Sequence, residues 1–278
     1  MRTLLVVALM AWTAMCWGAE PGDGKPELTM ISGAVKKTGK LKTGDYEAEG
    51  VLVVPKGITL VVEAGAYLKL PKGFNVAGKL VVAGTKEKPV YIECGAVRPI
   101  LSGETILRYC RMKGSRPTLN GTLNARKSVF DGVMFELRGK ASFDSCILRD
   151  AVWLYAYGLL VEFKDSVFYK LPLNLWSSAL VTARRLDIVD AEHGIRVAGG
   201  TSKIEGLVYV SGVPEHKRIV DVNDDARLGR AVIGKLADEP FNPKMIEFAK
   251  KYKFEPPYHR KLDAWKRKNG DDVVMTRR

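Results

Sequence analysis

Short apolar runs recur along the middle of the chain, separated by polar or glycine-containing breaks. Between residues 141 and 220 the pattern repeats every 20 to 21 residues, and each repeat holds three such runs. Repeats built from helix pairs need about 33 residues or more, so this period is too short for them. It is typical of a solenoid in which each coil carries three short strands and equivalent residues stack from coil to coil.

The period predicts which residues stack on one another in successive coils. Three apolar columns are expected: Phe143, Phe163 and Ala183; Met112, Phe130, Ile147, Phe168, Ile188 and Tyr209; Tyr155, Leu175, Ile195 and Val220. A fourth column of small residues would hold Cys110, Ser128, Ser145 and Ser166. Because the columns are expected to fill the core, function should reside in outward-facing residues and in the corners.

Residues 51–93 are the most regular part of the pattern, with strands that alternate with turns rich in glycine and proline. Two successive motifs are present: Val54-Pro55, Gly57, Thr59-Leu60, Val62-Glu63, Gly65-Ala66 and Leu68, then Gly78, Leu80, Gly84-Thr85, Pro89-Val90 and Ile92. The segment resembles the first coils of exported bacterial proteins with the pectin-lyase-like fold. The resemblance implies an all-β, right-handed parallel β-helix, but no particular activity, since one fold supports many functions.

The two ends of the chain predict its location and its domains. Residues 1–18 have the charge and apolar pattern of a signal peptide cleaved near Gly18, which predicts a secreted, periplasmic or cell-surface protein. Met15 is too bulky for the lipid-attachment site that Cys16 would otherwise suggest. We expect a flexible leader at 19–32, the β-helix domain at 33–234 and a basic cap or tail at 235–278. A helix at 243–254 should cover the last coil, and 268–278 should be disordered.

Charge and cysteine content narrow the partners. The formal net charge of +13 favours polyanions, and export favours a polysaccharide or cell-surface glycan over nucleic acid. No transmembrane segment is predicted, and the oligomeric state stays open. Cleavage would leave an odd number of cysteines, so at least one thiol should be free; a bond between Cys94 and Cys110 is left open.

The densest polar cluster supplies the candidate catalytic residues Arg185, Asp187, Asp190, His193 and Arg196. In polysaccharide lyases with a β-helix fold, an Arg or Lys removes a proton next to a uronate carboxyl group, although no lyase signature is present here as a block. Paired carboxylates perform acid and base catalysis in glycosidases. The candidate substrate-binding residues are Trp176, Arg184 and Lys170. The alternative is a solvated face, because every second strand residue points outward.

Aromatic residues crowd two adjacent coils. Trp153, Tyr155 and Tyr157 alternate along one strand, and we expect this trio to face the core, whereas Trp176 beside Ser177-Ser178 should be exposed. Exposed rings with polar tips would suit a wet glycan interface.

Metal and cofactor signals are weak. Asp221, Asn223 and Asp225 have the spacing of a calcium loop, but Ala226 and Val232 stand where such a loop needs Gly and Glu. We therefore predict no metal and no cofactor, leaving a looser calcium site open. The leading functional prediction is binding of acidic or other glycans on a lateral groove, with lyase or hydrolase activity open. The alternative is a structural or adhesive surface protein.

Overall fold

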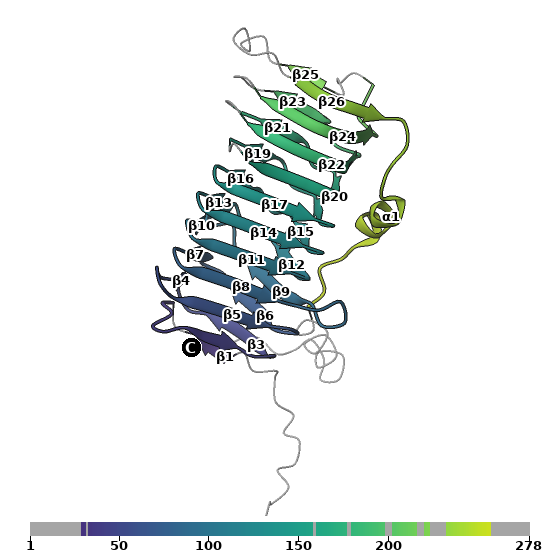
Figure 1. Cartoon of the computed structure of the whole chain (residues 1–278). Coiled ribbons are helices and arrows are strands. Elements are labelled where there is room, and N and C mark those ends of the chain that lie inside the picture. The colour runs from purple at the N-terminus through teal and green to yellow at the C-terminus, as the bar shows by residue number, and fades with distance from the viewer. Residues whose placement is uncertain are drawn as a thin grey trace, which may run out of the picture.

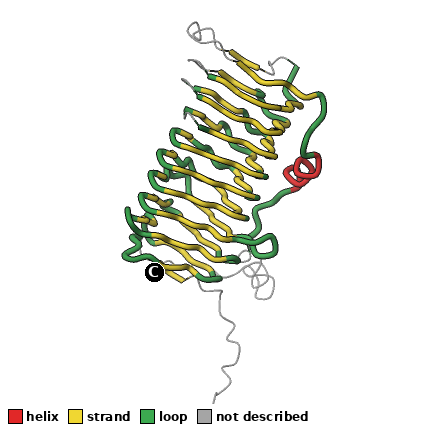
Figure 2. Tube along the Cα trace, viewed as in Figure 1, coloured by secondary structure: helices red, strands yellow, loops and turns green. Residues whose placement is uncertain are grey.

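The computed structural model describes residues 29–31, 33–157, 160–176, 179–197, 202–215, 220–222 and 232–256. Within these residues the chain is an all-β parallel solenoid with one short helix near its C-terminal end (Figures 1 and 2). This confirms the parallel β-helix architecture that the 20-residue period predicted. The predicted signal peptide lies outside the described residues, but residues 29–31 of the expected flexible leader form a strand.

Each coil contributes strands to three lateral faces, and each strand pairs in parallel with its equivalents in the coils on either side. Face 1 contains β2 (Gly39–Leu41), β5 (Thr59–Glu63), β8 (Lys79–Ala83), β11 (Glu104–Arg108), β14 (Thr122–Arg126) and β17 (Lys140–Asp144). Face 2 contains β1 (Thr29–Ile31), β3 (Asp45–Ala48), β6 (Tyr67–Leu70), β9 (Val90–Cys94), β12 (Cys110–Lys113), β15 (Val129–Asp131) and β18 (Ile147–Arg149).

Later strands bend and cross from face 1 to face 2. They are β20 (Val161–Tyr169), β22 (Leu180–Val189), β24 (Lys203–Ser211) and β26 (Val232–Ala237). Face 3 contains β4 (Leu52–Val54), β7 (Phe74–Val76), β10 (Ile100–Leu101), β13 (Thr118–Leu119), β16 (Glu136–Leu137), β19 (Leu154–Ala156), β21 (Leu173–Leu175), β23 (Ile195–Val197) and β25 (Val220–Val222).

Alternation along each strand fills the interior. In β5, Leu60 and Val62 are buried and stack on Leu80 and Val82 of β8, while the alternate residues of the strand point outward. Every second side chain of a strand points to the same face. Because the apolar residues alternate in the same way in every coil, they stack into continuous apolar columns. In the middle coils the core contains aromatic rings in place of aliphatic side chains, and Phe143 stacks on Phe163 with ring centroids 5.2 Å apart.

The column of Phe143, Phe163 and Ala183 is confirmed, but two other columns were placed one residue off. Met112 and Phe130 are followed inside by Leu148, and Ile188 is followed by Val210. Ile147 and Tyr209 therefore point away from the core column to which the sequence assigned them. The small-residue column is continued by Cys146, whose backbone N–H donates to Ser166 Oγ at 3.2 Å, and not by Ser145.

The third column is also corrected. Tyr155 pairs with Asn174, whereas Leu175 pairs with Ala156 and Val197. Ile195 and Val220 do pair, as predicted. The errors arise because coil lengths vary at the corners, and a shift by one residue turns every side chain to the other side of a strand.

Corner residues explain these shifts. Tyr109, Lys127, Ser145, Asp165 and Arg185 all have a positive φ, between 47° and 65°, at the corner between faces 1 and 2. This left-handed conformation disfavours residues other than glycine. Backbone hydrogen bonds to the next coil hold it in place, such as that from the N–H of Ser145 to the carbonyl of Lys164 at 2.8 Å. A corner residue thus belongs to neither strand column.

The C-terminal segment, residues 238–256, which we call the strap, runs back along the outside of face 2 (Figure 1). Its helix α1 (Pro243–Lys251) buries Ile246 and Ala249 against Val129, Ile147 and Val167. Ile147 thus faces outward because the strap covers it. The expectation that the helix lies over the last coil is wrong: α1 contacts β18 and β20 on the side of the solenoid.

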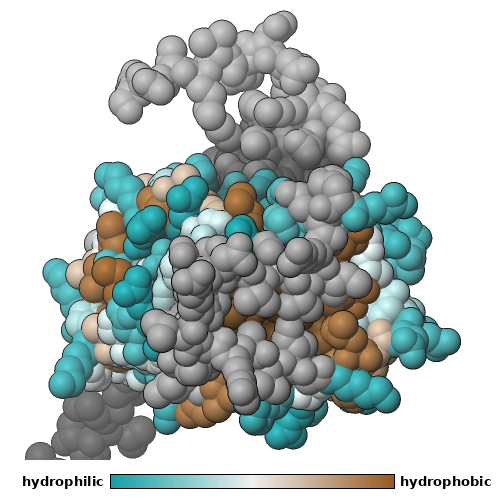
Figure 3. Space-filling view, turned by 90° about the horizontal axis from the view of Figure 1, so that it is seen from above, coloured by the Kyte–Doolittle hydropathy of each residue, from teal (hydrophilic) through white to brown (hydrophobic). Residues whose placement is uncertain are grey.

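The strap is also held by polar and aromatic contacts. Arg149 donates hydrogen bonds to the carbonyl oxygens of Ala249 and Tyr252, which satisfies groups left free at the C-terminal end of a helix. Further along, Phe254 meets Tyr91 of β9 edge to face at 5.7 Å. Seen from the end formed by the last coils, hydrophilic residues surround the rim and apolar residues show towards the middle (Figure 3). Leu207 and Leu236, in the last two coils, are 39% and 41% exposed.

Cys94, Cys110 and Cys146 are free and buried, so the disulfide considered between the first two is absent from the described residues. Burial raises the pKa of Cys94 and Cys146 to about 12. We expect none of these three thiols to react with Ellman's reagent at pH 8 in the folded protein, because the thiolate is the reactive form. All three should react after denaturation in guanidinium chloride. Rapid labelling of any one of them in the native protein would contradict this burial.

Candidate functional site

Four aromatic rings gather on the outside of face 3, and with Arg138 they form what we call the aromatic patch. Tyr155 is at its centre, stacked on Trp153 with centroids 4.2 Å apart and 5.7 Å from the ring of Trp176. Tyr157 and Trp176 follow at 6.1 Å. The expectation that Trp153, Tyr155 and Tyr157 face the core is wrong, because each is only partly buried. The exposure predicted for Trp176 is confirmed at 38%.

The fold dictates this clustering. Arg138, Tyr157 and Trp176 each directly follow a buried face 3 residue, and those buried residues, Leu137, Ala156 and Leu175, stack in consecutive coils. The side chains after them therefore stack as well. The guanidinium carbon of Arg138 lies 5.1 Å from the ring centroid of Tyr157, a cation–π distance. The same guanidinium lies 3.6 Å from the carboxylate of Glu136, which Thr118 also contacts.

The hydroxyl of Tyr157 in the aromatic patch is uncharged at neutral pH. Partial burial, followed by the carboxylate of Glu136, raises the pKa of Tyr157 above its ordinary value. Its hydroxyl therefore stays protonated at neutral pH and can both donate and accept. The rings supply apolar faces, whereas the hydroxyls, indole N–H groups and guanidinium supply polar edges.

A hollow connects the patch to face 1. At the corner between faces 3 and 1, Arg138, Lys140, Thr122 and Leu160 border a concave region of about 460 Å³. It adjoins a second one of about 340 Å³ on face 1, which shares Thr122, Lys140 and Leu160. Polar side chains from four successive coils line the second hollow: Asn124, Ser142, Glu162, Thr182 and Arg184. An extended ligand could thus lie across both hollows and reach the aromatic patch.

The structure does not bring together the candidate catalytic residues Asp187 and Arg196 or the candidate substrate-binding residue Arg184, which belong to one polar cluster in the sequence. Arg184 points outward from face 1, where it pairs with Glu162 at 3.2 Å. Arg196 lies on face 3, two coils beyond Tyr155 in the same outward column. Asp187 lies on face 2, stacked between Val167 and Tyr209. Three members of one polar cluster in the sequence thus occupy three different faces.

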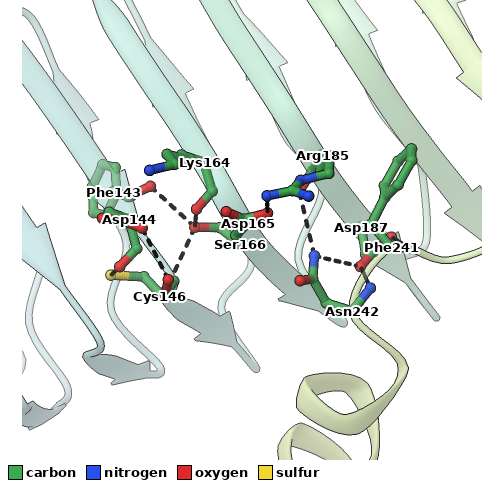
Figure 4. A network of polar contacts seen from close by, with 11 residues as sticks. Phe143, Asp144, Cys146, Lys164, Asp165, Ser166, Arg185, Asp187, Phe241 and Asn242 are labelled. Atoms are coloured by element: carbon green, nitrogen blue, oxygen red, sulfur yellow. Dashed lines mark hydrogen bonds and ion pairs between the residues drawn. The ribbon is translucent and has the colours of Figure 1, made fainter.

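Asp187 is completely buried and holds the strap (Figure 4). Its carboxylate accepts hydrogen bonds from the backbone N–H groups of Phe241 and Asn242, at 2.9 and 2.8 Å, and from the side-chain amide of Asn242 at 2.9 Å. Burial raises the pKa of Asp187 above its ordinary value, although these hydrogen bonds oppose the shift. Its contacts anchor the chain just before α1.

The remaining candidates lie at corners. Arg185 and Asp190 have positive φ angles of 65° and 55°, and Arg185 pairs with Asp165 at 2.5 Å. Lys170, at 53°, places its ammonium 5.4 Å from the ring centroid of Tyr169. His193 Nε2 lies 3.8 Å from a carboxylate oxygen of Glu192.

No three His, Cys, Asp or Glu side chains gather closely enough in the described ranges to hold a metal ion. Most of the loop with calcium-like spacing lies outside those ranges, including Asn223 and Asp225, so that open alternative stays untested. Among the described helices there is also none with the length and apolar character needed to cross a bilayer.

The sequence identified the aromatic residues but missed Arg138, Lys140 and the polar column of Asn124, Ser142 and Thr182. Together with Glu162, the members of this polar column are 18 to 20 positions apart, so the coil period alone could have aligned them. Comparison with protein-family models, with curated proteins and with solved structures finds no match to this chain. Its function therefore has to be argued from the geometry.

Proposed function

We propose that this protein is an exported β-helix protein of the pectin-lyase-like type that binds a glycan across the aromatic patch and the adjoining hollows. The observation that best supports this proposal is the cluster of four partly exposed rings on consecutive coils beside a polar, concave surface. One face of a pyranose ring carries C–H groups that pack against an aromatic ring, whereas its hydroxyls need polar partners. The patch offers both kinds of contact.

The linear arrangement supports a polymeric ligand. Equivalent positions in parallel strands are about 4.8 Å apart, so three or four coils span the length of a short oligosaccharide. Lys140 forms no ion pair with a carboxylate in the described part of the chain, and it is available for a uronate or sulfate group. These features support acidic glycans as the preferred ligands, with neutral ones as weaker ligands.

Binding without cleavage is the form of the proposal that the geometry favours. The candidate groups for acid and base catalysis are distributed over face 2, face 3 and the corners, and the carboxylate of Asp187 is engaged by the strap. The alternative, a structural or adhesive protein without a small ligand, would leave the aromatic patch unused. Export rests on the predicted signal peptide at residues 1–18.

An immobilised-glycan assay tests the proposal. At low salt we expect the full chain to be retained by at least one of polygalacturonate, alginate, a sulfated glycan and cellohexaose. Tyr157→Ala or Trp176→Ala should weaken that binding about tenfold, because losing one stacking ring costs about 1.5 kcal/mol. Affinity is measured by titration with a soluble oligomer of the retained glycan.

Ile100→Ala is the matched control, since Ile100 is an exposed apolar residue on face 3 several coils away. It should change the affinity less than about twofold. Absence of retention by every glycan would favour the structural alternative. Equal affinities of Trp176→Ala and Ile100→Ala would remove the aromatic patch from the site.

A further inference from the structure

A further hollow, independent of the glycan proposal, lies where the strap crosses the corner between faces 1 and 2. It is open to solvent and has a volume of about 420 Å³. Its apolar lining comes from both sides: Val129 and Ile147 belong to face 2, and Met245 and Phe248 belong to α1. The strap therefore completes this cavity, and the solenoid without it would present only an open strand surface.

Four cationic side chains border the hollow. Its lining includes Lys86, Arg111, Lys127 and Lys244, and contains no carboxylate among the described residues. None of the four forms an ion pair within the described parts of the chain. Two of them lie against rings: Lys127 Nζ is 5.5 Å from the centroid of Tyr109, and the Arg111 guanidinium carbon is 5.7 Å from that of Phe248.

Four like charges around one apolar cavity repel one another, and a bound anion would relieve that repulsion. Arg111 is only partly exposed, and its guanidinium carbon lies 5.7 Å from the ring centroid of Phe248 and 5.9 Å from that of Tyr252, so these cation–π contacts hold it beside the hollow.

We infer that this cavity, which we call the strap pocket, binds a small amphipathic anion. The ligand would be a carboxylate, sulfonate or phosphate monoester attached to an aromatic or short aliphatic body. The apolar body would pack against Ile147, Met245 and Phe248, and the anionic group would meet Lys127, Lys244 and Arg111. Ligand pockets commonly combine a mainly apolar lining with a few polar groups that fix orientation, and the volume matches their lower range.

The dye 8-anilinonaphthalene-1-sulfonate has this chemistry and tests the inference on the full, folded chain. We expect one saturable site, seen as enhanced fluorescence at low salt. The double variant K127Q/K244Q should weaken binding at least about tenfold, and raised salt should weaken binding to the native protein, because exposed charge interactions are screened. Equal dye affinity in native protein and double variant, or no binding to the folded protein, would overturn the inference.

Controls separate the pocket from general charge and from unfolding. Lys72→Gln removes one exposed positive charge at a residue outside the lining of this cavity, and it should alter dye affinity less than about twofold. The neutral analogue N-phenyl-1-naphthylamine should bind the native protein and the double variant alike. Unchanged melting temperatures of the variants ensure that the dye does not report partial unfolding.

A free anion and a membrane lipid could present the same chemistry, and two further arms distinguish them. We expect octanoate to compete with the dye, and we expect no co-sedimentation of the protein with phosphatidylglycerol vesicles through this site. Co-sedimentation that is lost in K127Q/K244Q, without competition by octanoate, would overturn assignment to a small soluble anion. Neither outcome depends on whether the aromatic patch binds glycans.

Discussion

Replacing Asp187 with alanine is expected to release the strap from face 2. The native carboxylate accepts three hydrogen bonds, and the substitution would leave the two backbone N–H groups of Phe241 and Asn242 without that acceptor. Losing a charged acceptor and leaving donors unsatisfied costs about 2–4 kcal/mol. Since about 1.4 kcal/mol is tenfold, local opening of the strap should increase about 30-fold or more.

Hydrogen–deuterium exchange of residues 238–256 measures this opening, because exchange from locally unfolded states reports their free energy. Glu162→Ala is the control, since it removes a carboxylate from an exposed ion pair with Arg184 and such pairs contribute about 0–1 kcal/mol. Strand β20 should keep its protection in both variants. Unchanged exchange of α1 in Asp187→Ala would contradict the role of Asp187 as the anchor of the strap. Because α1 forms one wall of the strap pocket, the same variant should also bind the anionic dye more weakly.

Phe143→Ala is expected to destabilise the middle of the solenoid more than any surface substitution. The ring is fully buried, and its centroid lies 5.5 Å from that of Phe135 and 5.2 Å from that of Phe163. Removing a buried phenylalanine ring costs about 3–5 kcal/mol, through lost burial and the cavity left behind. The neighbouring rings of Phe130, Phe135 and Phe163 come from β15, the turn before β16 and β20, so the surroundings cannot easily close the gap.

Urea unfolding, followed by circular dichroism, measures this loss. Phe143→Leu keeps most of the volume and should cost less than about 2 kcal/mol, while Ile100→Ala at an exposed position should stay within about 0.5 kcal/mol. Solenoids can unfold in stages, so the midpoints of all transitions are compared. A loss in Phe143→Ala no larger than that in Ile100→Ala would contradict the stacked aromatic core.

The architecture could be predicted from the sequence because each coil repeats the same short pattern of strand and turn residues. Strand residues alternate and corners carry turn residues, so a period near 20 residues specifies a parallel solenoid. The exact register could not be predicted. Left-handed corner residues such as Ser145 and Asp165 carry ordinary side chains, and without the backbone conformation they read as strand residues. Because Ser145 was counted as a strand residue, the predicted register of the next strand was shifted by one position, and Ile147 was assigned to the core.

The candidate site was only partly predictable. Trp176 was correctly placed on the surface, but Tyr155 was assigned to the core because an outward aromatic and an inward aromatic have the same sequence pattern. Asp187 was interpreted by its neighbours along the chain, yet its partners Phe241 and Asn242 are 54 and 55 residues away. Only the path of the strap reveals that this carboxylate binds the strap.

The most direct test of the glycan-binding account is fluorine NMR of the full chain labelled with 5-fluorotryptophan. Trp→Phe variants assign the resonances of Trp153 and Trp176. Titration with an oligomer of the glycan retained in the binding assay should shift both resonances along one saturation curve. Saturable binding without a shift at Trp153 or Trp176 would contradict the proposal that the aromatic patch is the glycan site.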